Sequence, residues 1–250
     1  MKESSLNGIS FHSVETDELV KILDSNIKGQ RKPKHIAITN TESMYFANKY
    51  SDHKKYLLEA AISLCDGVAI TLAGKIFNTK IKRYHGPDFI LDVIRLGQEK
   101  AWKHYFLGST KVVNDDLINY FKKTFQKVKI VGSYCPPFRD LTRNEENEMI
   151  SDINQSRPDF LWVGLGLPKQ EKWIAYYKNK LDVPWNIGVG AAFDFHAGFK
   201  HRPPKLIQTS GLEWLFRMIK EPRMIPRNIR SLYQFLFIIL SNIFVKRSSK

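Results

Sequence analysis

Residues 160–178 read FLWVGLGLPKQEKWIAYYK. The first five, Phe160 to Gly164, are apolar and end in glycine, which predicts a buried strand running into a turn. The stretch from Gln170 to Lys178 carries apolar residues at helical spacing. A strand, a glycine turn and a helix in this order form the repeating unit of a mostly parallel sheet covered by helices.

The same alternation extends through the first two thirds of the chain. Val68 to Leu72 is apolar but too short to assign to either type. Further strands are expected at 35–39, 105–108, 128–132 and 186–190, and further helices within 43–62, 89–100, 114–125 and 145–154. We therefore expect an α/β fold with helices on both faces of the sheet. In open sheets of this kind, ligands bind beyond the carboxyl ends of the strands.

Positive charge is concentrated in the last fifth of the chain. The 250 residues carry a formal net charge of +14, and from Lys200 onward there are eleven basic side chains against two acidic ones. Such a balance attracts phosphates, whether in nucleic acid, anionic lipid or a small substrate. Four arginines here, Arg217, Arg223, Arg227 and Arg230, recur at spacings compatible with one helical face. A run of charges is also commonly just a solvated surface.

The last forty residues break the α/β pattern. Apolar positions from Leu212 to Ile219 predict a helix, and Pro222 and Pro226 are expected to interrupt the following turns. Leu232 to Val245 is then nearly all apolar. This run is shorter than the roughly 20 residues that span a bilayer, so we expect a basic, apolar helix lying in the membrane interface. The alternative is a last core helix with a docking surface for another subunit.

The N-terminus and the two cysteines indicate the cellular compartment of the protein. The first eight residues are polar, so no signal peptide is expected. Cys65 and Cys135 lack metal-ligand spacing, which favours a reduced, cytoplasmic setting. The seven histidines show no paired ligand spacing, so we expect no metal site and no cofactor.

Two glycine-rich turns follow predicted strands, Gly164-Leu-Gly166 and Gly188-Val-Gly190. Backbone amides in such turns approach phosphates closely, and a following helix N-terminus adds partial positive charge. Neither turn has the third glycine of a dinucleotide fingerprint, and neither is a Walker motif. Glycines at these places also serve tight packing where a strand ends, so both roles remain open.

Asp66 stands in Leu-Cys-Asp-Gly, just before a predicted turn. A carboxylate in this position acts either as a general base or as a helix cap, and the pattern alone favours the cap.

Taken together, the motifs resemble those of the WecG/TagA/CpsF glycosyltransferases. Upstream, Asn40 with Ala47, Asp66-Gly67, Arg83 with Gly86 and Asp88, and Gly132 to Phe138 fit the family in order and spacing. The longest motifs are GLGLPKQEKW at 164–173, GVGAAFDFHAG at 188–198, KHRPP at 200–204, GLEWLFR at 211–217 and EPR at 221–223. The resemblance covers residues 6 to 235, and motifs of this length are specific.

The resemblance implies a Rossmann-like core, residues 1–210, and a helical appendage, residues 211–250, that covers the active site and binds the membrane. It implies inverting transfer of a sugar from a UDP-sugar to an undecaprenyl-diphosphate-linked sugar, for teichoic acid or another cell-surface polysaccharide. The donor sugar is expected to be a hexose or an N-acetylhexosamine of the N-acetylmannosamine type, with glucose or N-acetylmannosaminuronate as the alternatives. The enzyme is expected on the inner face of the bacterial cytoplasmic membrane; a homo-oligomer is compatible with the sequence.

The resemblance also assigns site residues. Asp66 maps onto the family's base, and Arg83 is expected to be catalytic with it. Expected substrate contacts are Thr39, Asn40, Tyr134, Gly164, Gly166, Gln170, Gly190, Asp194, Arg217, Arg223 and Arg227.

The chain departs from the family pattern at two places. Many members have threonine where this chain has Ile38, so Thr39 is expected to substitute or the contact is lost. Met224 also stands where many members have a second arginine after Arg223.

No metal is expected in the reaction. Many nucleotide-sugar transferases hold a divalent ion with an Asp-x-Asp pair, but no two aspartates are separated by one residue anywhere in this chain. Arginines or helix dipoles are then expected to neutralise the leaving diphosphate.

Two other classes of protein share single features with this sequence. The charge alone suggests nucleic-acid binding, but the chain has no recognised module, and its basic residues share a segment with long apolar runs. The α/β pattern suggests a nicotinamide-dependent oxidoreductase, but the full glycine fingerprint is missing. We therefore expect no nucleic-acid partner and no nicotinamide cofactor.

Overall fold

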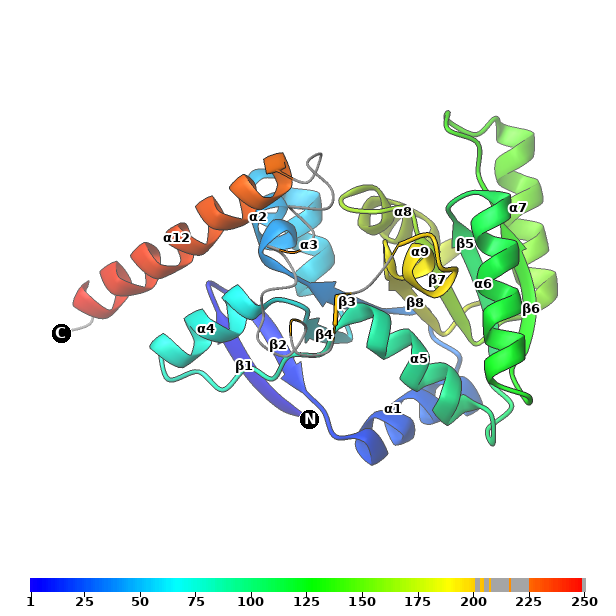
Figure 1. The fold of residues 1–250 in the computed structure, drawn as a ribbon, viewed down its shortest axis with the longest axis horizontal. Helices are drawn as coiled ribbons and strands as arrows, with labels where there is room; N and C mark the ends of the chain where they lie inside the picture. Colours follow the sequence, from blue (N-terminus) through cyan, green and yellow to red (C-terminus); the bar gives the residue numbers. More distant parts are fainter. Residues whose placement is uncertain (201–202, 205–206, 208–215, 217–224, 249–250) are drawn as a thin grey trace.

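The structure, a computed structural model, describes residues 1–200, 203–204, 207, 216 and 225–248 (Figure 1). Its centre is a six-stranded sheet with the order β4-β3-β8-β7-β5-β6, in which every neighbouring pair is parallel. The strands are β3 (Lys34–Thr39), β4 (Ile62–Cys65), β5 (Lys103–Gly108), β6 (Lys129–Tyr134), β7 (Phe160–Gly164) and β8 (Trp185–Gly188). The expected α/β fold with a parallel sheet is confirmed.

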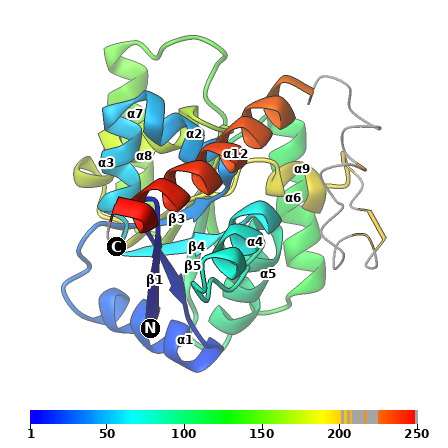
Figure 2. The same cartoon turned by 90° about the vertical axis from the view of Figure 1, so that its left-hand side faces the viewer.

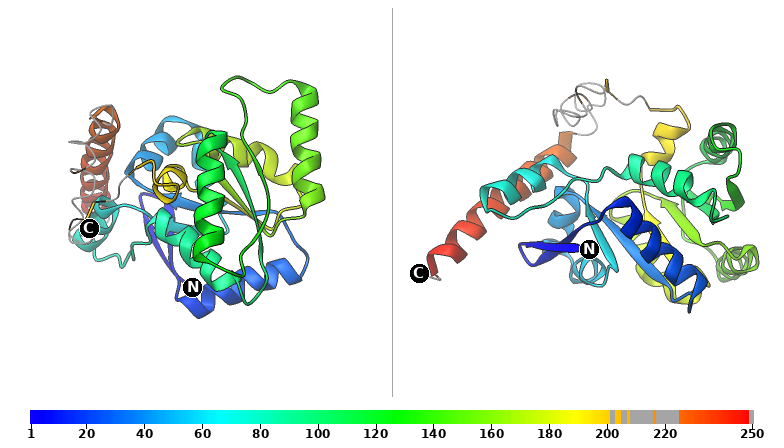
Figure 3. Two further views of the ribbon diagram at one scale, coloured as in Figure 1. Left: turned by 45° about the vertical axis from the view of Figure 1, so that its right-hand side comes forward. Right: turned by 90° about the horizontal axis from the view of Figure 1, so that it is seen from below.

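Helices cover both faces of the sheet (Figure 3). One apolar core includes side chains from α1 (Thr16–Lys28), α5 (Gly86–Gly97), α6 (Lys111–Thr124) and α9 (Ala192–His196). The other core includes side chains from α2 (Thr41–Lys49), α3 (Ser51–Leu58), α4 (Val68–Ile76), α7 (Arg143–Ser156), α8 (Lys169–Tyr177) and α12 (Ile225–Ser248). A short 3₁₀ helix, Lys178–Lys180, follows α8.

The strand β7 shows how the sequence separates the two cores. Its side chains point alternately to opposite faces of the sheet. Phe160 and Trp162 belong to the core that contains α5, whereas Leu161 and Val163 belong to the core that contains α8. An uninterrupted apolar run is therefore what a central strand buried on both faces requires.

Two predicted element boundaries and one missed hairpin need correction. The helical prediction extended to Ile62, but residues 62–65 form β4, and Val68 to Leu72 belongs to α4. A buried strand of four residues cannot be told from a helix end by periodicity. The polar N-terminus forms a hairpin of β1 (Lys2–Leu6) and β2 (Ile9–Ser13). Asn7 and Gly8 form its turn with positive φ angles of 51° and 72°, and an Asn-Gly pair is a typical hairpin turn.

The connections leave the sheet towards opposite faces at the carboxyl end of β8. The strand β8 is followed by α9, which packs in one core, whereas its neighbours β3 and β7 are followed by α2 and α8, which pack in the other. Chains that leave a sheet towards opposite faces open a crevice between them, which is where ligands bind in open α/β sheets. The loops after β3, β4, β7 and β8 border this edge.

The last helix, α12, lies across α2 and α4 (Figure 2). Pro226 does not interrupt it as expected, because it stands in the first turn, where a proline is tolerated. The helix turns polar side chains towards the protein: the Gln234 Oε1 accepts a hydrogen bond from Asn48 at 3.0 Å, and Asn7 bonds Ser241. Exposed apolar side chains lie on its outer face: Ile229, Leu232, Tyr233, Leu236, Phe237, Leu240 and Ile243. No helix within the described ranges is long and apolar enough to cross a membrane.

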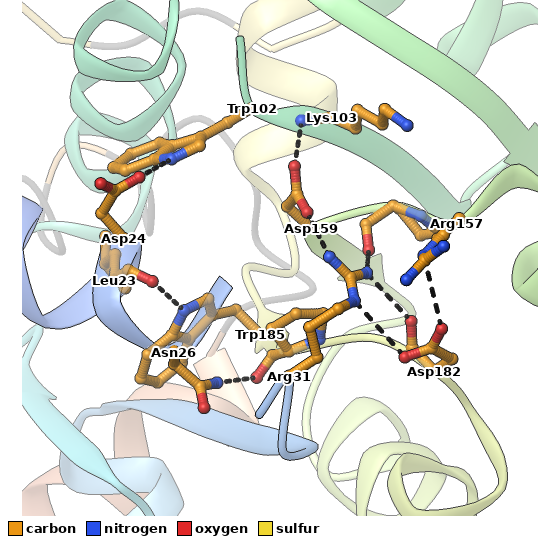
Figure 4. A network of polar contacts seen from close by, with 12 residues as sticks. Leu23, Asp24, Asn26, Arg31, Trp102, Lys103, Arg157, Asp159, Asp182 and Trp185 are labelled. Carbon is orange, nitrogen blue, oxygen red and sulfur yellow. Dashed lines mark hydrogen bonds and ion pairs between the residues drawn. The ribbon is translucent and has the colours of Figure 1, made fainter. Parts of the chain in front are cut away.

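A polar network lies at the opposite, amino-terminal edge of the sheet (Figure 4). Arg31 donates to the Asp159 carboxylate at 2.8 Å, and the other Asp159 oxygen accepts the Lys103 backbone N–H at 2.9 Å. The Arg31 and Asp159 side chains are only 18% and 10% exposed. Arg31 also donates to the carbonyl of Pro158 at 2.9 Å. The network therefore joins the segment after α1 to the starts of β5 and β7.

We expect Arg31→Ala to lower the free energy of unfolding by about 3 kcal/mol, because it leaves the Asp159 carboxylate buried without its cation. Urea denaturation measures this. The matched control is Arg157→Ala, whose side chain is 64% exposed and 3.8 Å from Asp182, and which should cost less than about 1 kcal/mol. Equal losses for the two variants would contradict the structural role given to Arg31.

Candidate active site

Asp66 lies directly after β4, at the carboxyl edge of the sheet. Its backbone N–H donates to the carbonyl of Thr39 at 2.8 Å, which fixes the turn beside the end of β3. Its side chain is 20% exposed and lies 3.7 Å from the Nε2 of His85. The N-cap of α4 is Gly67, so Asp66 is not the cap residue that the sequence pattern favoured. A partly exposed carboxylate at this edge is placed to meet a ligand.

Asn40 lies directly after β3, in the loop next to the one that contains Asp66. It is the N-cap of α2, and its Oδ1 accepts a hydrogen bond from the Ser43 backbone at 3.0 Å. A Cβ on Gly67 would lie 3.6 Å from the Asn40 Cα, so the two loops are in contact. The N-termini of α2 and α4 therefore meet at this edge, where their partial positive charges favour an anion.

Arg83 is held beside Asp66 by backbone pairing. It forms an isolated parallel bridge with Cys65, and the next residue, Tyr84, donates to the Cys65 carbonyl at 2.8 Å. The segment thus continues the sheet edge next to β4. Burial raises the pKa of the Cys65 thiol to about 12, so this thiol stays protonated at neutral pH and is no nucleophile. The Asp66 carboxylate and the neighbouring His85 imidazole are then groups of this corner that can accept a proton.

Gln170 holds the two glycine turns together. Its Oε1 accepts the Gly166 backbone N–H at 3.2 Å, and a Cβ on Gly188 would lie only 2.8 Å from its Nε2. Gly166 and Gly190 have φ angles of 75° and 51°, which glycine adopts without strain. Gln170 is 4% exposed, and its Nε2 also donates to the neighbouring Glu171. Both roles considered for the glycines remain, but tight packing explains Gly188 directly.

Glu171 is a buried acid that the sequence analysis did not single out. Its Oε1 accepts a hydrogen bond from the Gln170 Nε2 at 2.9 Å, and the side chain is buried beneath the turns. Burial, with the nearby Glu42 charge adding to it, raises the pKa of Glu171 to about 8, so this carboxyl is largely protonated at neutral pH. The sequence pattern around Glu171, in the predicted helix after Gln170, does not indicate that this side chain is buried.

Ion pairs with Glu42, in the first turn of α2, hold the helix α12 at the same edge of the sheet. The Arg227 Nε lies 2.6 Å from one Glu42 oxygen, and Arg230 lies 2.7 Å from the other. The Glu42 side chain is only 6% exposed. Arg227 was expected to contact substrate, and the structure pairs it with the carboxylate of Glu42, which stands two residues after Asn40. Glu42 was not predicted, since a lone acid in a helix carries no signal of its distant partner.

The other expected site residues lie in different surroundings. The Thr39 side chain is fully buried, with its hydroxyl 3.3 Å from Ser63, so only the Thr39 backbone meets Asp66. Ile38 points to the opposite face and lies near Gly86. Asp194 pairs with Lys200 at 2.6 Å. Tyr134 ends β6, five strand spacings or about 24 Å from β4. Arg217, Arg223 and the helix expected at 212–219 lie outside the described residues.

The corner of Asp66, Arg83 and the two helix N-termini combines two chemical abilities. A partly exposed carboxylate can accept a proton from a hydroxyl. An arginine and helix dipoles can stabilise a negative charge that develops on a departing phosphate. The arrangement fits transfer of a group from a phosphate ester or diphosphate to a hydroxyl.

Comparison with known proteins agrees with this chemistry. Residues 4–249 match the model of the family described as "Glycosyl transferase WecG/TagA/CpsF family". An N-acetylglucosaminyldiphosphoundecaprenol N-acetyl-beta-D-mannosaminyltransferase of Bacillus spizizenii is 26% identical over 89% of this chain and 85% of its own length. A Staphylococcus aureus protein with the same name is 22% identical over 93% of this chain and 90% of its own.

Proposed function

Because the chain belongs to the WecG/TagA/CpsF family and is a glycosyltransferase, we propose that it moves N-acetylmannosamine from a UDP-sugar to N-acetylglucosaminyl-diphospho-undecaprenol. The proposed acceptor and sugar are those in the names of the relatives. Each of these matches covers most of this chain and most of the relative. The product then serves teichoic acid or another cell-surface polysaccharide, as expected from the motifs.

The observation that carries the proposal is the placement of Asp66. The carboxylate lies at the carboxyl edge of the sheet, beside Arg83 and the N-termini of α2 and α4. In the proposed step Asp66 takes the proton of the acceptor hydroxyl, and the hydroxyl oxygen bonds to the anomeric carbon of the donor. The bond from that carbon to the diphosphate breaks at the same time, and UDP leaves with the electron pair. Attack opposite the leaving group inverts the configuration.

The leaving diphosphate needs positive charge, which we assign first to Arg83 and the helix dipoles. Arg227 is engaged by Glu42, so its expected contact with the diphosphate requires the Glu42 pair to exchange for phosphate. Arg217 and Arg223 remain predicted contacts. Residues 1–210 are proposed as the transferase core, and 211–250 as the appendage that reaches it.

We further propose that α12 holds the enzyme on a membrane surface, which is where a lipid-linked acceptor is found. The support is the distribution of side chains on the helix. Polar side chains of α12 bond the protein, while leucines and aromatic residues are exposed along its outer face. Such a face buries apolar area in the headgroup region of a bilayer.

The test of the transfer is incubation of the protein with a panel of UDP-sugars and a short-chain N-acetylglucosaminyl-diphospholipid, read by mass spectrometry. We expect the acceptor to gain one N-acetylhexosamine, with UDP-N-acetylmannosamine as the preferred donor. Transfer of glucose alone, or of an uronic acid alone, would move the enzyme to another donor class of the same family.

We predict that this transfer does not depend on a divalent metal, because the chain has no Asp-x-Asp pair and places cationic groups at the proposed diphosphate site. Turnover in excess EDTA should equal turnover with added magnesium. Loss of activity in EDTA, restored by magnesium or manganese, would contradict the prediction.

A further inference from the structure

A hollow of about 630 Å³ lies between the β1–β2 hairpin and the segment that follows α4, and its lining ends at Lys82, one residue before Arg83. Its surface is mostly apolar, but the residues that line it include four lysines and no acidic residue: Lys2, Ser13, Lys75, Asn78, Thr79, Lys80, Ile81 and Lys82. Two bonds fasten its walls together: the Ser4 hydroxyl donates to the Lys80 carbonyl at 2.9 Å, and the Lys82 N–H donates to the Ser13 hydroxyl at 3.3 Å. The hollow is therefore part of the fold.

Three of the four lysines carry uncompensated charge. Lys82 pairs with Glu15 at 2.9 Å. Within the described part of the chain, no carboxylate lies at ion-pair distance from Lys2, Lys75 or Lys80. Like charges brought together without acids raise the local potential and attract an anion.

The hollow is continuous with an exposed apolar surface. Leu72 and Ile76 of α4 are 48% and 53% exposed, and Lys75 lies on the same helical face, three residues after Leu72. The helix α4 contacts α12, and Figure 2 shows the hairpin, α4 and α12 on one side of the molecule. Cationic side chains at the border of an apolar face are typical of surfaces that bind anionic membranes.

We propose that this hollow binds the phosphate headgroups of anionic phospholipids and forms a second membrane contact beside α12. The inference rests on the proposed attachment of α12 and adds what that helix alone does not supply. The apolar face of α12 is a single narrow contact with the membrane, and a second contact beside it makes the attachment broader. The lysines at α4 and the hairpin supply this second contact.

The experiment measures binding to vesicles of phosphatidylglycerol and phosphatidylcholine, mixed one to three, by co-sedimentation. Each lysine near an anionic surface is worth about a fivefold change in partition, so Lys75→Gln with Lys80→Gln should weaken binding about 25-fold at low salt. The matched control is Lys122→Gln with Lys123→Gln, two exposed lysines of α6, which should change binding less than twofold. Binding to pure phosphatidylcholine should be equal for both variants and the wild type.

The outcomes separate this inference from the attachment of α12. Wild-type binding of the Lys75/Lys80 variant to the anionic vesicles would overturn the lysine contact, even if substitutions on the outer face of α12 still release the protein. If the variant instead loses turnover on a soluble short-chain acceptor without vesicles, the hollow holds the acceptor diphosphate and the lipid headgroup proposal is wrong. Equal weakening by the α6 control would show that only net charge matters, and would also overturn it.

Discussion

Asp66→Asn is expected to lower turnover by about 10²- to 10⁴-fold, the usual effect of removing one general base. Asparagine keeps the size of the side chain but cannot take the proton of the acceptor hydroxyl. The side chain is 20% exposed and its backbone N–H makes the contact to Thr39, so folding should be unaffected. Turnover is measured at saturating donor and acceptor.

The affinity for donor should change little, because the proposed role concerns the acceptor proton. A matched control is Asp115→Asn, which removes a carboxylate on the surface of α6 that pairs with Lys111, and which should leave turnover unchanged. An Asp66→Asn enzyme with normal folding and near-normal turnover would show that another group is the base.

Replacing three outward leucines of α12, Leu232, Leu236 and Leu240, with serine is expected to reduce partition to vesicles on the order of 10³-fold. Burial of a leucine is worth at least about 1.5 kcal/mol, so three together give this factor. These side chains are more than half exposed, and their loss should not alter the thermal unfolding temperature. Flotation with vesicles measures the effect.

Substitution is a sharper test here than truncation before Leu232. Gln234 and Ile238 of the same helix are buried against the protein, so truncation would also open the core. The matched control replaces three exposed apolar residues elsewhere, Leu58, Val112 and Tyr176, with serine. Equal release of both triple variants would contradict a specific role of α12, as would full binding of the α12 variant.

The sheet could be predicted from the sequence because its strands are short apolar runs that end at glycine or polar turns. The run Phe160 to Gly164 is buried on both faces, which is what its composition predicts. The strand at Ile62 was missed because four residues directly after a helix are too few to show a change from the helical pattern. The N-terminal hairpin was missed because only Asn7-Gly8 signals it among polar residues.

The positions of the candidate site residues could be predicted where motifs lie at strand ends, and could not where partners are distant in the chain. Asp66, Asn40 and Arg83 follow or flank β3 and β4, whose carboxyl ends are adjacent. Glu42 carries no local signal, since its partners Arg227 and Arg230 are more than 180 residues away. The burial of Glu171 and the direction of the Thr39 side chain depend on packing between elements. The hydrophobic periodicity of the sequence carries no information about that packing.

The most direct test of the central claim, a single displacement with Asp66 as the base, is the configuration of the new glycosidic bond. The product of the wild-type enzyme with α-configured UDP-N-acetylmannosamine and the short-chain acceptor would be examined by NMR of the anomeric position. We expect one added sugar, attached by a β bond. An α-linked product would contradict the proposed mechanism, and no transfer from any UDP-sugar would contradict the proposed function.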